Sequence, residues 1–205
     1  MKITIFTSGT TGKQKRITHD EVDFYKPAQF LCNKWDLKSN DVILNPFPLW
    51  TIASWAFCIM PARISNCEVV NVKMDPFKFW NVVEEVRPTV LTLAIGTFRT
   101  LIKRKTPNLK YIKNLCTGSA PVTDWDINQL KATKAKKIWN IYGSTECIPP
   151  VLISNNTVFN FKDSPYTSIY SKTNNSLFVD GVDTEDIFEH NQCIGRQIIN
   201  ETWKS

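Results

Sequence analysis

The chain alternates short apolar runs with longer stretches of mixed apolar and polar residues. The apolar runs predict strands at 2–6, 41–44, 67–72, 88–95, 111–116 and 137–141. The stretches between them predict helices at 20–35, 49–64, 75–87, 97–105 and 123–135. Asp20 and Asp75 are candidate N-caps, Pro76 suits a first helical turn, and Pro27 is a candidate kink. Strand–helix alternation predicts an α/β fold, with a parallel sheet covered by helices and ligands beyond the carboxyl ends of the strands.

The sequence pattern changes after residue 146. Short β-like pieces at 157–161, 166–170, 176–179, 186–189 and 193–199 are separated by Asn, Asp and Ser. They predict a small antiparallel sheet or barrel appended to the α/β core. We therefore expect an α/β core at 1–147 and a small β-subdomain at 148–205.

The loop after the first strand is rich in hydroxyls, glycines and lysines. It reads Thr7-Ser8-Gly9-Thr10-Thr11-Gly12-Lys13-Gln14-Lys15. Glycine permits a tight turn, and hydroxyls and converging N–H groups suit a phosphate. Only two residues separate Gly9 from Gly12-Lys13, which disfavours a kinase or GTPase P-loop. An ordinary turn explains the same composition, and this loop alone leaves both interpretations open.

Six motifs along the chain resemble those of one family. The loop resembles the phosphate loop of the adenylate-forming superfamily of acyl/aryl-CoA synthetases, peptide-synthetase adenylation domains and luciferases, and Asn140-Ile141-Tyr142-Gly143-Ser144-Thr145-Glu146 is similar to its Asn-x-Tyr-Gly-x-Thr-Glu motif. Between them, Pro48-Leu49-Trp50-Thr51 and Gly118-Ser119-Ala120-Pro121 resemble its acyl-pocket and adenine-loop segments. Thr184-Glu185-Asp186 and Ile194-Gly195-Arg196 resemble its Thr-Gly-Asp and hinge motifs.

The resemblance implies a site for ATP and Mg²⁺. Ser8, Thr10, Thr11 and Lys15 would hold the β- and γ-phosphates, Thr145 the α-phosphate and Glu146 the Mg²⁺, a hard cation that prefers carboxylate and phosphate oxygens. Lys15, Thr145 and Glu146 would be catalytic, because negative charge must be neutralised at the transferring phosphoryl group.

The rest of the nucleotide would lie on the later motifs. Tyr142 would stack on adenine, bordered by Asn140 and the 118–121 backbone, Asp186 would accept the ribose hydroxyls, and Arg196 would lie near the ribose. Structural alternatives remain open: Tyr142 as a core aromatic, Glu146 as a carboxylate in the first turn of a helix, and Asp186 as a loop residue.

The carboxylic acid would lie in a pocket formed by Trp50, Thr51, Ile95, Gly96 and Cys147. Thr51 stands where many acyl-CoA synthetases carry His, and residues 51–55 lack the Asp that pairs with an amino-acid ammonium, which disfavours an α-amino acid. Other departures concern geometry: Gln14 and Arg16 flank Lys15 where the family has Pro and Gly, and Glu185 replaces a Gly.

The chain also differs from the family in length. The family's long region before the phosphate loop and its small C-terminal domain are not among these 205 residues. That domain carries a lysine that contacts the carboxylate and α-phosphate, and loss of such a cation costs about 10²–10³ in rate. We therefore expect slow adenylation unless a partner supplies the group, and a bare apolar face that favours self-association into a homo-oligomer.

The sequence thus predicts an ATP- and Mg²⁺-dependent ligase that forms acyl-AMP from a carboxylic acid and passes the acyl group to coenzyme A, a carrier protein or an amine. The alternative is a non-catalytic AMP or acyl-adenylate binding or regulatory module. His19 is expected to be a local hydrogen-bonding residue rather than a catalytic base.

Composition changes this picture little. With 42% hydrophobic and 21% charged residues, the chain has the composition of a soluble globule. The net charge of +6 suits ATP or coenzyme A and is equally consistent with nucleic acid. The basic clusters 103–105 and 134–137 are interpreted as solvated helix ends rather than a nucleic-acid patch. Six scattered cysteines, with no export signal or membrane span, indicate a reduced cytoplasmic protein.

Overall fold

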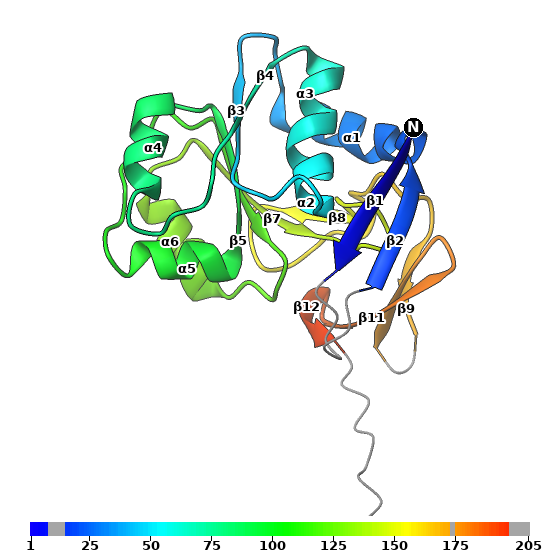
Figure 1. Ribbon diagram of the computed structural model, residues 1–205. Coiled ribbons are helices and arrows are strands. Elements are labelled where there is room, and N and C mark those ends of the chain that lie inside the picture. The colour runs from blue at the N-terminus through cyan, green and yellow to red at the C-terminus, as the bar shows by residue number, and fades with distance from the viewer. Residues whose placement is uncertain (8–14, 173–174, 197–205) are drawn as a thin grey trace, which may run out of the picture.

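The computed structural model describes residues 1–7, 15–172 and 175–196, and its largest part is a six-stranded sheet (Figure 1). Its strands are β3 (Val42–Asn45), β4 (Glu68–Asn71), β5 (Val90–Ala94), β6 (Asn114–Gly118), β7 (Lys137–Tyr142) and β8 (Leu152–Ser154). They lie in the order β4-β3-β5-β6-β7-β8; neighbouring strands pair in parallel, except β7 with β8. The chain runs from β3 to β4 and then crosses to β5 on the other side of β3. The predicted α/β fold with a mostly parallel sheet is confirmed.

Helices cover both faces of this sheet. α1 (Tyr25–Trp35) and α3 (Met60–Ser65) pack on one face, with Leu31, Trp35 and Ala62 against Ile43 and Ile141. α2 (Ile52–Ser54) and a π-helical turn (Trp55–Ile59) lead into α3. α4 (Phe79–Val86), α5 (Ile95–Ile102) and α6 (Asp124–Ala132) pack on the other face. The consecutive residues Ile43 and Leu44 lie in these two different clusters, as the period of two in a strand requires.

Residues 2–7 and 15–20 form a separate two-stranded sheet. β1 (Lys2–Thr7) and β2 (Lys15–Asp20) pair antiparallel, with Thr7 opposite Lys15. Ile3 and Ile5 pack against Phe24, Ala56 and Met60, so the hairpin lies on the α2–α3 side of the large sheet (Figure 1). We did not predict β2, because its residues KRITHD lack an apolar run.

A four-stranded antiparallel sheet completes the fold. It comprises β9 (Ile169–Ser171), β10 (Ser176–Val179), β11 (Val182–Glu189) and β12 (Gln192–Arg196), in the order β12-β11-β10-β9. This confirms the small appended β-sheet. Leu177, Val179 and Phe188 pack against Tyr142 and Leu152 of the large sheet. β8 lies after residue 147 in sequence and pairs with β7; the predicted division at 147/148 stays a prediction.

Several predicted elements are wrong in position. The 20–35 helix is a 3₁₀ turn (Glu21–Phe24) followed by α1, and Pro27 lies in the first turn of α1, where proline is tolerated. The 75–87 helix begins only at Phe79, because Asp75 starts a turn whose carbonyl accepts from the N–H groups of Lys78 and Phe79. The 49–64 helix begins at Ile52, since Thr51 caps it with its Oγ1 3.4 Å from the Ser54 N.

Two further strand assignments need correction. The run 111–116 becomes a strand only from Asn114, because Ile112 is used as a buried loop residue. Residues 157–161, all described, form no strand: Asn156 Oδ1 accepts from Val158 N, which makes a turn there. Within the described ranges, no helix is both long and apolar enough to cross a membrane.

Candidate nucleotide-binding site

The ends of β6 and β7 bring two of the predicted motifs together. Gly118 ends β6 beside Ile141, its Cα partner on β7, and Tyr142 ends β7 one residue later. A Cβ on Gly118 would lie 2.1 Å from the Ile141 carbonyl oxygen, so only glycine fits this position. The next residue, Ser119, has a φ of +72°, which turns the 118–121 segment away from the sheet. Segments 118–121 and 142–146 therefore leave the sheet at the same carboxyl edge.

The Arg99–Asp126 ion pair holds the 118–121 segment in place through the Pro121 carbonyl. Arg99 of α5 donates from Nε and Nη2 to the two carboxylate oxygens of Asp126, at 2.8 and 2.7 Å, and Nη2 also donates to the Pro121 carbonyl at 3.2 Å. Asp126 Oδ2 accepts from the N–H and hydroxyl of Thr123, the N-cap of α6. Burial alone would raise the pKa of Asp126, but the bonds from Arg99 and Thr123 outweigh it, so that pKa lies below its ordinary value.

Tyr142 joins the large sheet to the small one. Its ring is 7% exposed and packs edge-on against Phe188, with the ring centroids 4.8 Å apart. Its hydroxyl donates to Asp186 Oδ2 at 2.7 Å, across 44 residues of sequence. Burial raises the pKa of the Tyr142 phenol and the charge of Asp186 raises it further, so the hydroxyl stays protonated. Tyr142 is thus largely a core aromatic, and it holds the carboxylate predicted to bind ribose.

A bulge in β11 sets the position of Asp186. The register between β10 and β11 shifts between the pairs Ser176↔Ile187 and Phe178↔Asp183. Within this bulge, Glu185 has a φ of +58°, in the left-handed region that favours glycine. Glu185 is the residue that stands where the Thr-Gly-Asp motif has its glycine. Glu185 therefore adopts a backbone conformation that glycine would adopt at lower cost.

The 143–147 segment leaves Glu146 exposed. A Cβ on Gly143 would lie 2.4 Å from Cβ of Pro149, and Ser144 Oγ accepts from Cys147 N at 3.2 Å. Residues 143–150, all described, contain no helix, so the alternative that Glu146 lies in the first turn of a helix is wrong. The exposed carboxylate fits the predicted hold on Mg²⁺, which keeps several water ligands when a protein binds it.

His19 links the N-terminal hairpin to this segment. Its Nε2 lies 2.8 Å from the Thr145 carbonyl oxygen, and because a carbonyl only accepts, Nε2 carries the proton. At the other end of the hairpin, Phe6 N donates to the Trp50 carbonyl at 3.3 Å. The expectation that His19 bonds locally is wrong, since its partner lies 126 residues away. Nothing in the sequence singled out that partner.

Some residues of the predicted site lie outside the residues that the structure describes. Ser8, Gly9, Thr10, Thr11 and Gly12 fall in the range 8–14, which is outside the described residues. Thr7, Lys15 and Arg196 are described only by their backbone, at the ends of β1, β2 and β12. The roles given to these residues stay predictions.

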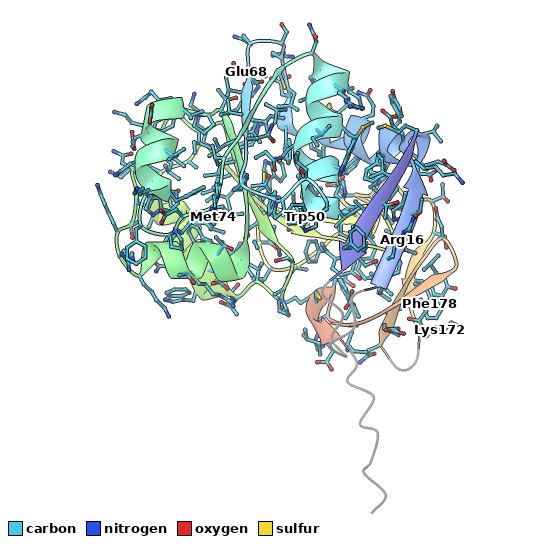
Figure 2. The ribbon with its side chains drawn as sticks, in the orientation of Figure 1. Arg16, Trp50, Glu68, Met74, Lys172 and Phe178 are labelled. Atoms are coloured by element: carbon cyan, nitrogen blue, oxygen red, sulfur yellow. The ribbon has the colours of Figure 1, made fainter. Side chains whose placement is uncertain are left out.

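The other predicted base and pocket residues have varied surroundings. Asn140 is buried and donates from Nδ2 to the Asn156 carbonyl at 3.1 Å, and Ile141 packs in the core. Trp50, labelled in Figure 2, is 60% exposed, and Thr51 Oγ1 donates to the Pro48 carbonyl.

Three further predicted acid-pocket residues lie on or near α5 and on the 143–147 segment. Ile95 and Cys147 lie in different hydrophobic clusters, while Gly96 lines an open depression of about 250 Å³ beside Met74 and Thr100. A pocket that gathers all five predicted acid-binding residues stays a prediction.

Arg99 is the structural residue that sequence reasoning missed. It lies in an amphipathic helix between the buried Phe98 and Leu101, and Asp126 lies three residues after the N-cap Thr123. In the sequence, Arg99 and Asp126 each have an ordinary local explanation, and only the folded structure shows that they form an ion pair. A cation beside the apolar face of a helix was the available signal.

Comparisons with known proteins agree with the motifs. The model of the AMP-binding enzyme family matches residues 2–174. The olefin beta-lactone synthetase of Stenotrophomonas maltophilia (strain K279a) is 23% identical over 155 residues, which are 75% of this chain and 28% of that protein. The chain therefore spans less than a third of the length of this curated relative.

Solved structures share the fold at low identity. An acyl-CoA synthetase (AMP-forming)/AMP-acid ligase II-like protein from Dyadobacter fermentans DSM 18053 aligns with a TM-score of 0.76 at 17% identity, over 95% of this chain and 60% of that one. The O-succinylbenzoate coenzyme A synthetase of Bacillus subtilis, in complex with ATP and magnesium ion, aligns with a TM-score of 0.64 at 18% identity, over 74% and 32%. With its motifs in order on this fold and a family match over most of its length, the chain belongs to the AMP-binding enzyme family.

Proposed function

We propose that this chain forms the nucleotide-binding part of an ATP- and Mg²⁺-dependent carboxylate-activating ligase. The reaction joins a carboxylate oxygen to the α-phosphorus of ATP and releases pyrophosphate, and a second step passes the acyl group to an acceptor such as coenzyme A. Family membership supports the carboxylate-activating class. The observation that carries the assignment of this site is the His19–Thr145 hydrogen bond, which ties the strand that follows the phosphate loop to the 140–146 motif.

In this proposal, different residues bind the adenine, the ribose and the phosphates of the nucleotide. The 118–121 backbone borders the adenine, held by Arg99 through the Pro121 carbonyl. Asp186 accepts ribose hydroxyls while Tyr142 occupies part of its Oδ2. Glu146, exposed to solvent, holds Mg²⁺, which supplies positive charge between the phosphates. Lys15 begins β2 directly opposite Thr7 and contributes a cation at the β- and γ-phosphates.

The test is carboxylate-dependent exchange of labelled pyrophosphate into ATP, over a broad panel of aryl, aliphatic and polar acids. We expect Lys15→Ala and Glu146→Ala each to lower exchange about 100-fold or more, because each removes a charged group that the proposal assigns to the phosphates or to Mg²⁺. Lys26→Ala and Glu85→Ala are matched controls, since both side chains are exposed on helices elsewhere, and they should leave exchange unchanged.

The alternative function is a binding module that holds AMP or an acyl-adenylate without turnover. The observation that favours it is that the described contacts of the 118–121 segment and of Asp186 support nucleotide binding, and none of them by itself requires turnover. Calorimetry with AMP, ATP and a non-hydrolysable acyl-adenylate mimic separates the two. Binding without exchange for any acid supports the module, and absence of both binding and exchange contradicts both proposals.

A further inference from the structure

The fold brings two basic segments of the chain side by side, at a distance from the candidate site. Leu109 N donates to the Thr133 carbonyl at 2.7 Å, and Lys136 N donates to the Ile112 carbonyl at 3.0 Å. These bonds align the segment after α5 with the segment after α6. Seven exposed cations lie on these two segments, and an eighth, Lys131, lies in the last turn of α6. We call these eight the basic face: Lys103, Arg104, Lys105, Lys110, Lys131, Lys134, Lys136 and Lys137.

The net positive charge of the protein comes from residues 103–137, the stretch that carries the basic face. Residues 103–137 contain nine lysines and arginines and two aspartates, a net charge of +7, while the rest of the chain has 16 basic and 17 acidic residues, a net charge of −1. Within the described residues, none of the eight cations makes an ion pair, whereas the ninth, Lys113, is paired with Asp36 and Asp41. Glu84 of the neighbouring α4 is paired with Arg87, 3.8 Å away. An unneutralised cluster of this size costs self-repulsion, which a bound polyanion relieves.

An exposed aromatic ring lies at the edge of the basic face. Phe77 is 73% exposed, and the guanidinium carbon of Arg104 lies 3.9 Å from the centre of its ring. Next to it is the apolar depression lined by Met74, Pro76 and Leu101 among others (Met74 is labelled in Figure 2). A large apolar side chain left in water beside a dense group of cations has the composition of a surface that enters the boundary of a lipid layer.

We propose that the basic face docks the protein onto a bilayer that contains anionic lipids. Seven of the eight cations are lysines, whose ammonium groups act as point charges suited to a diffuse negative surface. The only guanidinium, which has the planar geometry that recognises single phosphates, is stacked on Phe77. Phe77 adds apolar burial that a nucleic-acid backbone does not offer. These features favour a lipid surface over DNA or RNA.

This orientation leaves the nucleotide motifs uncovered, while the depression beside Phe77 is also lined by Gly96, one of the predicted acid-pocket residues. Lys137 begins β7 and Tyr142 ends it, so the lysines and the nucleotide motifs lie at opposite ends of the same strand. Docking on the bilayer and nucleotide binding are therefore separable, and this proposal does not depend on the proposed function. For a reaction on carboxylic acids, such docking would place the protein at a surface where amphipathic acids concentrate.

The test measures partition onto sedimented vesicles of phosphatidylcholine alone and of phosphatidylcholine with about one third phosphatidylserine. We expect binding to the anionic vesicles only, and weaker binding as salt shortens the Debye length from about 30 Å to about 8 Å. The triple variant K134Q/K136Q/K137Q should lower the partition constant about 100-fold. Its matched control is K2Q/K26Q/K162Q, which removes the same charge from exposed lysines elsewhere and should change partition less than about 3-fold.

A second pair of variants tests the apolar contact. Phe77→Ser should lower partition about 10-fold, while Val22→Ser, at another exposed apolar residue, should not change it. No binding to anionic vesicles at low salt, or equal losses in the two triple variants, would overturn the proposal. So would tighter binding to a single-stranded DNA oligomer than to the vesicles, since it would assign the basic face to nucleic acid.

Discussion

The six-stranded and the four-stranded sheets hold their parts of the candidate site by different means. The large sheet fixes Gly118 and Tyr142 through buried strands, where a backbone carbonyl fills the space beside Gly118. The small sheet fixes Asp186 through the bulge in β11, and tight turns join its strands. Of the ten non-glycine residues with positive φ among the described residues, five lie at 175–191: Asn175, Asp180, Glu185, His190 and Asn191. The comparison teaches that close packing makes the surroundings of Gly118 intolerant of substitution, while the position of Asp186 depends on backbone conformations and a few polar contacts.

The largest expected effect tests the packing of the large sheet. Gly118→Ala should destabilise the protein by about 3 kcal/mol or more, because the new Cβ meets the Ile141 backbone rather than a side chain that can move. Urea unfolding measures the change. The control is Gly96→Ala in α5, where no atom lies within 4 Å of the new Cβ and helix propensity should add about 0.5–1 kcal/mol. If both variants unfold alike, packing is not what holds the 118–121 segment.

The next effect concerns the charge that supports this segment. Asp126→Asn should cost about 2–3 kcal/mol at pH 7, less than a fully buried pair, because Arg99 remains 37% exposed and can be hydrated. The pKa of Asp126 is lower in the folded state, so its contribution is fully present above the unfolded value of about 3.9 and is lost as pH falls through the folded pKa. Below about pH 4, the stability of the variant should therefore change less with pH than the stability of the wild type does.

Thermal unfolding of Asp126→Asn between pH 7 and pH 2.5 measures both the loss of stability at pH 7 and the dependence of stability on pH. The control is Glu85→Gln, at an exposed position of α4, with no detectable change in stability at pH 7 expected. Parallel pH profiles of wild type and Asp126→Asn would contradict the role of the Asp126 carboxylate.

A smaller effect tests the link between the two sheets. Tyr142→Phe removes the hydrogen bond to Asp186 while keeping the ring against Phe188, and should cost about 1.5 kcal/mol. If Asp186 binds ribose, the free energy of AMP binding, measured by calorimetry, should weaken by a similar amount. Tyr170→Phe, at a 42% exposed ring of β9, is the control and should change neither quantity. A variant as stable as the wild type would show that the sheets are held by apolar contacts alone.

The smallest effect should be stabilising. Glu185→Gly should raise stability by up to about 1 kcal/mol, because glycine adopts the positive φ of the β11 bulge without strain. Glu189→Gly, in the same strand with no positive φ, should instead lower stability by about 0.5–1 kcal/mol. Chemical denaturation distinguishes the signs. Destabilisation by both substitutions would mean that the bulge is not strained by its side chain.

The sequence predicted what periodicity and order of motifs encode. Apolar runs located β5, which is buried on both faces, and β7, which is buried over its last three residues, and Thr123 marked the start of α6. It did not predict β2, whose residues are polar, or the late start of α4, where a turn at Asp75 competes with the helix. The pairs Tyr142–Asp186, Arg99–Asp126 and His19–Thr145 span 44, 27 and 126 residues, so local patterns carry no signal for them.

The N-terminal hairpin pairs with neither of the other sheets. It is anchored by its apolar cluster and by contacts near both of its ends, through Phe6 and His19. The register of β1 and β2 is therefore set independently of the six-stranded sheet. In evolution, the length of the segment between Thr7 and Lys15 can accordingly change without shifting the alignment of any strand in that sheet.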